Sequence, residues 1–110
     1  MALENRWEDL KTTRDGFLLH HQDWSPALAE FLAESVGIQL TPAHWEILRF
    51  IRSYHQAYQH LPNNRVFIKT IERELGGDKG NSLYLNQLFD GTPVRNACLI
   101  AGLPKPPGCI

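Results

Sequence analysis

Apolar residues recur at helical spacing in five segments of this chain, and a start or stop signal bounds each segment. Three segments begin with a hydroxyl residue followed by proline, at Ser25-Pro26, Thr41-Pro42 and Thr92-Pro93, which is typical of a helix N-terminus. Glycine or proline follows the end of most segments. The pattern predicts a mainly α fold, a compact bundle of about five helices over residues 26–36, 42–60, 64–75, 82–89 and 93–101.

The second predicted helix is the longest and carries the most aromatic residues. Trp45, Phe50, Tyr54 and Tyr58 follow one another along it at helical spacing. Such a stripe is more typical of a core than of a cofactor site. We therefore expect this helix to form the centre of the core.

Residues 1–24 lack helical periodicity. Asp15-Gly16 is a turn signal, and the apolar residues Phe17 and Leu18 follow it directly. These features predict a small N-terminal β-hairpin.

The end of the chain holds its two cysteines, Cys98 and Cys109, with Gly102, Gly108 and three prolines between them. Prolines exclude a helix and favour an extended, solvated segment. The stretch also has no apolar periodicity that would anchor it to a core. We expect a mobile C-terminal arm over residues 102–110.

The length of this arm permits two states. The eleven steps from Cys98 to Cys109 would span roughly 35 Å when fully extended, enough for Cys109 to enter a pocket of a partner. A disulfide instead needs the two Cα atoms within roughly 4.4–6.8 Å, and closing that loop costs about 3 kcal/mol of chain entropy. We expect an extended form with two thiols and a folded form in which sulfur bridges them.

Two basic residues could support the thiols. Arg95 lies one turn before Cys98 and should favour its thiolate, whereas the C-terminal end of a helix opposes it; the sequence leaves this balance open. Lys105 partly offsets the α-carboxylate of Ile110, which lies beside Cys109. As alternatives, Cys98 could be a small buried apolar residue, or the pair could form a structural disulfide, which is the least favoured interpretation.

Composition fits one domain over residues 1–110, with 43% hydrophobic and 21% charged residues. The net charge of −1 gives no basic excess of the kind that nucleic-acid binding requires. No apolar run approaches the length of a membrane span, and no export signal follows Met1. We expect a cytoplasmic location, where paired thiols are more often chemical than structural.

The five histidines do not indicate an enzyme. His20-His21 has no partner at metal-ligand spacing, and His44 is more typical of a capping or core-edge residue. The chain shows no Ser/His/Asp order and no phosphate-binding loop. We expect no cofactor and no metal, and a carrier rather than a stand-alone catalyst.

A basic cluster on the third predicted helix suggests a rival function. Arg65, Lys69, Arg73 and Lys79 follow a helix and a short turn, which resembles a helix-turn-helix. Nearby acidic residues interrupt the cluster, so a solvated face or a docking surface for an acidic partner is the favoured interpretation. A nucleic-acid-binding regulator remains the alternative of another class.

Several motifs are specific enough to indicate a family. They are Leu40-Thr41-Pro42-Ala43-His44-Trp45-Glu46, Lys79-Gly80-Asn81-Ser82-Leu83-Tyr84-Leu85 and Ala101-Gly102-Leu103-Pro104-Lys105-Pro106 with the ending Gly108-Cys109-Ile110. Together they resemble the DsrC/TusE family of sulfur-relay proteins, which includes the gamma subunit of dissimilatory sulfite reductase. The resemblance extends over nearly the whole chain.

The resemblance implies roles for both cysteines. The penultimate cysteine of the family carries sulfur, which implies that Cys109 holds it as a persulfide. DsrC-type members have a second cysteine that corresponds to Cys98, which would resolve or bridge the sulfur as a trisulfide. TusE-type members generally keep only the penultimate one, so the presence of both favours the DsrC type.

The resemblance also implies partners. They are dissimilatory sulfite reductase, a siroheme enzyme, to or from which sulfur is delivered, a DsrEFH-type or TusBCD-type sulfur donor, and a membrane-bound thiol reductase. The alternative within the family is a TusE-like relay for tRNA 2-thiouridine synthesis, which would need Cys109 but not Cys98.

Overall fold

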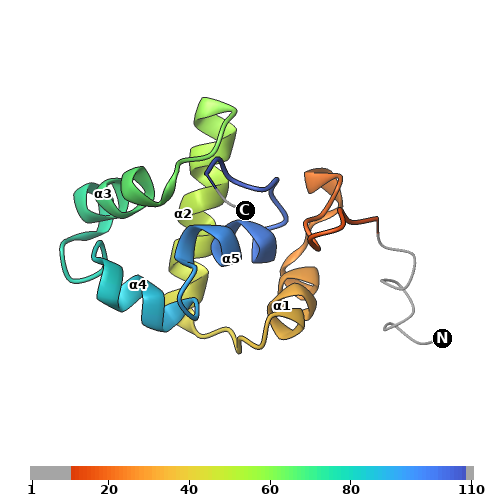
Figure 1. The fold of residues 1–110 in the computed structure, drawn as a ribbon, viewed down its shortest axis with the longest axis horizontal. Coiled ribbons are helices and arrows are strands. Elements are labelled where there is room, and N and C mark those ends of the chain that lie inside the picture. Colours follow the sequence, from red (N-terminus) through yellow and green to blue (C-terminus); the bar gives the residue numbers. More distant parts are fainter. Residues whose placement is uncertain (1–10, 109–110) are drawn as a thin grey trace.

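The last helix, α5 (Pro93–Ile100), lies at the centre of the molecule, and the other helices surround it (Figure 1). The computed structural model describes residues 11–108. Within them the chain forms η2 (His21–Asp23), α1 (Pro26–Ser35), α2 (Pro42–Tyr58), α3 (Asn64–Leu75) and α4 (Ser82–Leu88) before α5. The five predicted helices are confirmed, with ends that shift by at most two residues.

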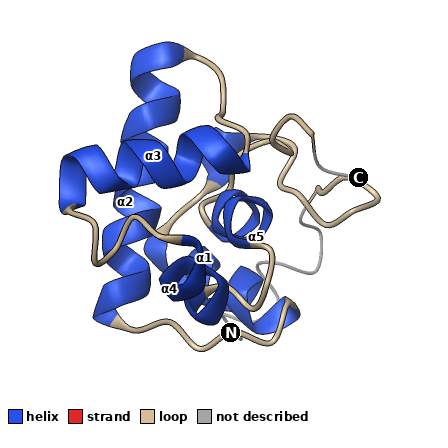
Figure 2. Ribbon diagram, turned by 60° about the vertical axis from the view of Figure 1, so that its left-hand side comes forward, coloured by secondary structure: helices blue, strands red, loops and turns tan. Residues whose placement is uncertain are grey.

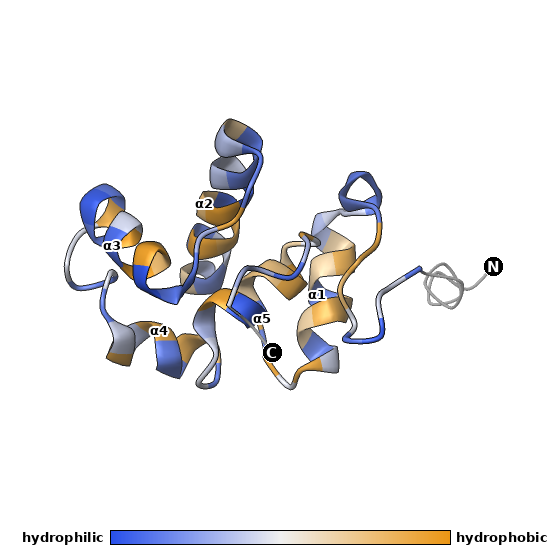
Figure 3. Ribbon diagram, turned by 45° about the horizontal axis from the view of Figure 1, so that its top comes forward, coloured by the Kyte–Doolittle hydropathy of each residue, from blue (hydrophilic) through white to orange (hydrophobic). Residues whose placement is uncertain are grey.

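The expectation that the long helix forms the centre of the core is wrong. Seven of the eight residues of α5 are buried, and α1, α2, α3 and α4 all contact it. By contrast, α2 buries only one face, which includes Ile47, Leu48 and Ile51. Figure 3 shows hydrophilic residues at the C-terminal end of α2, which leads to α3. A short helix with a single charged residue can be enclosed on all sides, whereas an amphipathic helix covers the core from outside.

Helix starts follow the local signals in the sequence. The Oγ of Ser25 accepts a hydrogen bond from the backbone N–H of Leu28, and the side chain of Asn81 accepts one from Tyr84. Asn63, rather than Asn64, caps α3 through the N–H of Val66. These bonds satisfy donors that the first turn of a helix cannot pair internally.

His44 joins the start of α2 to the end of α4, as a capping or core-edge residue does. Its Nδ1 accepts from the backbone N–H of Thr41 at 3.1 Å. Its Nε2 lies 2.7 Å from the carbonyl oxygen of Leu88, so the Nε2 proton is donated there. Both ring nitrogens of this buried side chain are thus used in the fold.

The predicted N-terminal β-hairpin is not present in residues 11–108, where Figure 2 shows only helices and loops. A single antiparallel bridge joins Thr12 to Leu18. Phe17 and Leu18 are consecutive and both buried, although neighbours in a strand point to opposite faces. Both side chains enter the core, and the chain then turns into η2. The backbone pairing between the two segments therefore stops after the single bridge. Residues 1–10, which the prediction also included, lie outside the described part.

Among residues 11–108, no helix has the length and apolar character that crossing a membrane requires.

Candidate functional site

The root of the C-terminal arm is built as a tight reversal at the end of α5. The N–H of Leu103 donates to the carbonyl of Cys98 at 2.9 Å, and the N–H of Gly102 donates to that of Leu99 at 3.2 Å. This pair of bonds is a Schellman motif, with Gly102 in the left-handed conformation at φ +72°. The arm therefore leaves α5 in a defined direction (Figure 1).

Two side chains from distant elements satisfy the last carbonyls of α5. Trp24 donates its indole N–H to Ile100 at 2.8 Å, and Arg52 donates from Nη1 to Ala101 at 2.6 Å. The Arg52 guanidinium also lies 4.1 Å from the centre of the Trp24 ring. A positive charge at a helix C-terminus is favoured by the helix dipole, so Arg52 both caps and neutralises this end.

Trp24 also explains why the arm begins with glycine. A Cβ on Gly102 would lie less than 3.0 Å from three atoms of the Trp24 side chain. Only a residue without a side chain lets the chain pass so closely beneath the ring.

The described part of the arm is anchored rather than solvated. Leu103 is 1% exposed, Pro106 is buried, and the Nζ of Lys105 lies 3.0 Å from Oδ2 of Asp15. The prediction of an extended arm without core contacts is therefore wrong for residues 102–106, because single apolar residues without periodicity can still find a buried position. Mobility of the arm stays a prediction.

This anchoring shortens the reach of the penultimate thiol. Cys109 itself lies outside the described residues. It follows Pro106 by three steps, which span roughly 10 Å at most, compared with roughly 35 Å from Cys98. Deep insertion into a partner would require the arm to be released from Leu103 onward.

Cys98 lies inside α5 with 0% of its surface exposed. Its burial agrees with the interpretation as a small core residue, while its proposed chemical role stays a prediction. Arg95 points toward the turn around Asp15 and Gly16, which we call the N-terminal turn. Its Cζ lies 5.3 Å from the centre of the Phe17 ring. Its predicted effect on the Cys98 thiolate is not tested by this contact.

Lys105 pairs with Asp15, in the turn that precedes Phe17. Its hydrogen bond and charge lower the pKa of the Asp15 carboxyl, and Arg95 adds a smaller lowering. The two basic residues predicted to support the thiols thus act on the same carboxylate. Lys105 thereby links the arm to the turn, and Arg95 of α5 contacts the same turn at the Phe17 ring.

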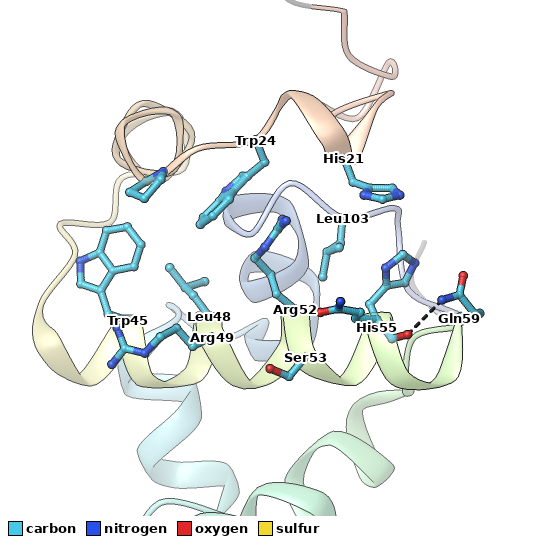
Figure 4. A pocket seen from close by; sticks show the side chains of 12 residues that line it. His21, Trp24, Trp45, Leu48, Arg49, Arg52, Ser53, His55, Gln59 and Leu103 are labelled. Atoms are coloured by element: carbon cyan, nitrogen blue, oxygen red, sulfur yellow. Dashed lines mark hydrogen bonds between the residues drawn. The ribbon is translucent and has the colours of Figure 1, made fainter.

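The described part contains a groove that the sequence did not indicate, which we call the basic groove. Its volume is ≈ 840 Å³, and it lies between α2 and the segment that contains η2, beside Leu103 of the arm (Figure 4). It is lined by His21, Trp24, Pro26, Trp45, Leu48, Arg49, Arg52, Ser53, His55, Gln56, Gln59 and Leu103. The α2 residues recur at helical spacing, a signal that could have indicated a surface.

The sequence and the fold of this chain match those of known proteins. A family model described as "DsrC like protein" matches residues 5–110. The chain belongs to this DsrC-like family. The resemblance inferred from the motifs is confirmed.

Three relatives illustrate the range of this family. "Sulfurtransferase TusE" of Yersinia pseudotuberculosis is 46% identical over 110 residues and covers 100% of both chains. The NMR structure of Allochromatium vinosum DsrC is 42% identical, with a TM-score of 0.81 over 90% of this chain and 88% of that one. The oxidized gamma subunit of dissimilatory sulfite reductase (DsrC) from Archaeoglobus fulgidus is 39% identical, with a TM-score of 0.78 over 92% of each chain.

The motif from Lys79 to Ser82, part of the resemblance to the DsrC-like family, has a structural explanation. Lys79 forms an ion pair with Glu46 at 2.8 Å, which raises the pKa of its ammonium, and Asn81 caps α4. A Cβ on Gly80 would lie less than 3.0 Å from backbone atoms of Glu72. These residues join α2, α3 and α4 at one point and therefore serve the fold.

The basic cluster on α3 is partly neutralised. Arg73 lies 3.5 Å from Glu74, and Lys79 pairs with Glu46, while Arg65 and Lys69 are exposed. DNA binding by this helix stays a prediction. No group of three potential metal ligands occurs within residues 11–108.

Proposed function

We propose that this chain is a cytoplasmic sulfur relay of the TusE type, which accepts sulfur on Cys109 as a persulfide and passes it on for tRNA 2-thiouridine synthesis. Support comes from full-length relatives that carry the name sulfurtransferase TusE. The observation that carries the proposal is the anchored arm root. Trp24 and Arg52 bind the last carbonyls of α5, so the chain leaves the core at a fixed point shortly before Cys109.

The transfer step is a thiol–persulfide exchange without net oxidation. The Cys109 thiolate attacks the outer sulfur of a persulfide on a TusBCD-type or DsrEFH-type donor. The S–S bond of the donor breaks, its cysteine leaves as a thiolate, and Cys109 now holds the persulfide. A tRNA thiouridylase would then take the outer sulfur in the same way.

A short, anchored tether suits this exchange between protein surfaces. The exposed Gly108 allows local rotation, while Pro107 before it restricts the backbone and keeps the search volume small.

The DsrC-type function is the second candidate, and one observation favours it. Leu103 donates its N–H to the carbonyl of Cys98, so the arm doubles back at the residue that would bridge to Cys109. A trisulfide would form when the Cys98 sulfur bonds to the outer sulfur of the Cys109 persulfide; both sulfurs lose their protons to water, and two electrons pass to an oxidising partner. In this function Cys109 exchanges sulfur with dissimilatory sulfite reductase, and a membrane-bound reductase then returns both cysteines to free thiols. The complete burial of Cys98 requires local opening for this step.

Intact mass after incubation with inorganic polysulfide tests both candidates. We expect a gain of one sulfur atom in the wild type and in Cys98→Ala, and none in Cys109→Ala. If the protein is of the DsrC type, we also expect the trisulfide between Cys98 and Cys109 to form under mild oxidant in the wild type and not in Cys98→Ala. Loading that persists without Cys109 would rule out both candidates, and the helix-turn-helix hypothesis would then be tested with DNA.

A further inference from the structure

We propose that the basic groove docks an acidic segment of the protein that exchanges sulfur with Cys109. The occupant places an apolar side chain between Trp24 and Trp45 and its carboxylates toward Arg49 and the histidines. This inference rests on the proposed function, because it assigns the binding surface of that partner.

All the charged side chains that line the groove are basic. Arg49 and Arg52 line it together with His21 and His55, and none of its lining residues is Asp or Glu. The whole chain has a net charge of −1, so the positive charge of this surface is not shared by the molecule as a whole. A surface of one sign attracts a segment of the opposite sign and excludes segments of its own.

The two histidines of the groove lie next to each other. The rings of His21 and His55 lie edge to face, 5.4 Å apart. Burial lowers the pKa of His55, and the like charges of His21 and Arg52 lower it further. A carboxylate in the groove would relieve this repulsion.

The dimensions fit a peptide segment rather than a small ion. The lining residues extend from Trp45 of α2 to Gln59, the residue after its end, which corresponds to roughly 21 Å along the helix axis, the length of about six extended residues. Figure 4 shows Trp24, Trp45 and Leu48 toward one end and the two histidines toward the other. A small oxyanion would contact only part of this surface, and large apolar anchors are typical of protein interfaces.

Arg49 is available for such a partner, whereas Arg52 is already engaged. Arg52 binds Ala101 and stacks on Trp24. Arg49 is exposed, and no ion pair within residues 11–108 involves it. An occupant would also contact Trp24 and Leu103, which form the arm root, so docking brings the partner to the base of the arm.

The test is an NMR titration of the ¹⁵N-labelled full chain with a short synthetic peptide of alternating Glu and Leu. We expect saturable shifts of the indole N–H resonances of Trp24 and Trp45. Arg49→Glu should weaken binding roughly tenfold, about 1.4 kcal/mol. Arg65→Glu reverses an exposed charge on α3 and is the matched control, which should bind as the wild type does.

Three results would overturn the inference. They are equal affinity for wild type and Arg49→Glu, equal binding of a Gly/Leu peptide without carboxylates, and saturation of the same resonances by thiosulfate or by a short RNA at lower concentration than the peptide. Polysulfide loading of Cys109 is measured separately in Arg49→Glu and should be unchanged. Failure of loading in the wild type would defeat the proposed function and leave the docking result standing.

Discussion

The Nζ of Lys105 lies 3.0 Å from Oδ2 of Asp15, so an ion pair joins the C-terminal arm to a turn 90 positions earlier in the chain. Both side chains are partly exposed, which limits what the pair adds to global stability. Its effect is local. It restrains the arm between the buried Leu103 and the exposed Gly108.

Removing this ion pair should loosen the arm without unfolding the protein. We expect Asp15→Asn to lower the ¹⁵N heteronuclear NOE of the amides of Lys105 and Gly108 and to leave the values in α5 unchanged, because loosening the arm needs only the arm contacts to break. Asp90→Asn, at an exposed position with positive φ that asparagine tolerates, is the control. Equal NOE values in the wild type and Asp15→Asn would show that Leu103 and Pro106 hold the arm alone.

The same ion pair should make the arm sensitive to acid. Lys105 lowers the pKa of Asp15 below its usual value of 3.8. The contribution is therefore complete above that usual value and is lost as the pH falls through the lowered pKa. Carboxyl ¹³C shifts should show Asp15 titrating at lower pH in the wild type than in Lys105→Met. Identical titration curves would show that Lys105 does not set the pKa.

Gly102→Ala should destabilise the protein by about 2–4 kcal/mol. About 1–2 kcal/mol comes from placing an L-residue in the left-handed conformation, and the remainder comes from the collision with Trp24. Gly37 has a similar φ of +75° but open space around it, so Gly37→Ala should show only the conformational part. Urea unfolding of both variants measures the difference, and equal losses would mean that Trp24 moves aside without cost.

Gly80→Ala should be more harmful than Gly77→Ala. The new Cβ at position 80 would collide with the backbone of Glu72, which cannot rotate away, so we expect a loss of about 3 kcal/mol or more. At position 77 the nearest atom is a carboxylate oxygen of Glu72 at 3.9 Å, an ordinary contact. Thermal unfolding compares the two, and a similar melting temperature would contradict a fold role for the Lys79–Ser82 motif.

The candidate site was only partly predictable. The sequence identified the two cysteines and the glycine at the arm root, because unusual residues at a chain end are visible without a structure. It did not identify Trp24 and Arg52 as the residues that bind the arm root, since each lies about 50 or more positions from its carbonyl partner. The sequence does not indicate the basic groove, because Trp45 and Leu48 of its α2 wall also fit the stripe that predicts a core.

The sequence alone determined the five helices, because signals such as Ser25-Pro26 and Asn81-Ser82 act within one turn of the chain. The family motifs were equally local. Only the tertiary structure decided that α5 is the enclosed helix, that one bridge replaces a hairpin, and that the arm is anchored through Leu103 and Lys105. These outcomes depend on which distant side chains share a limited interior volume, and spacing along the chain carries no information about that competition.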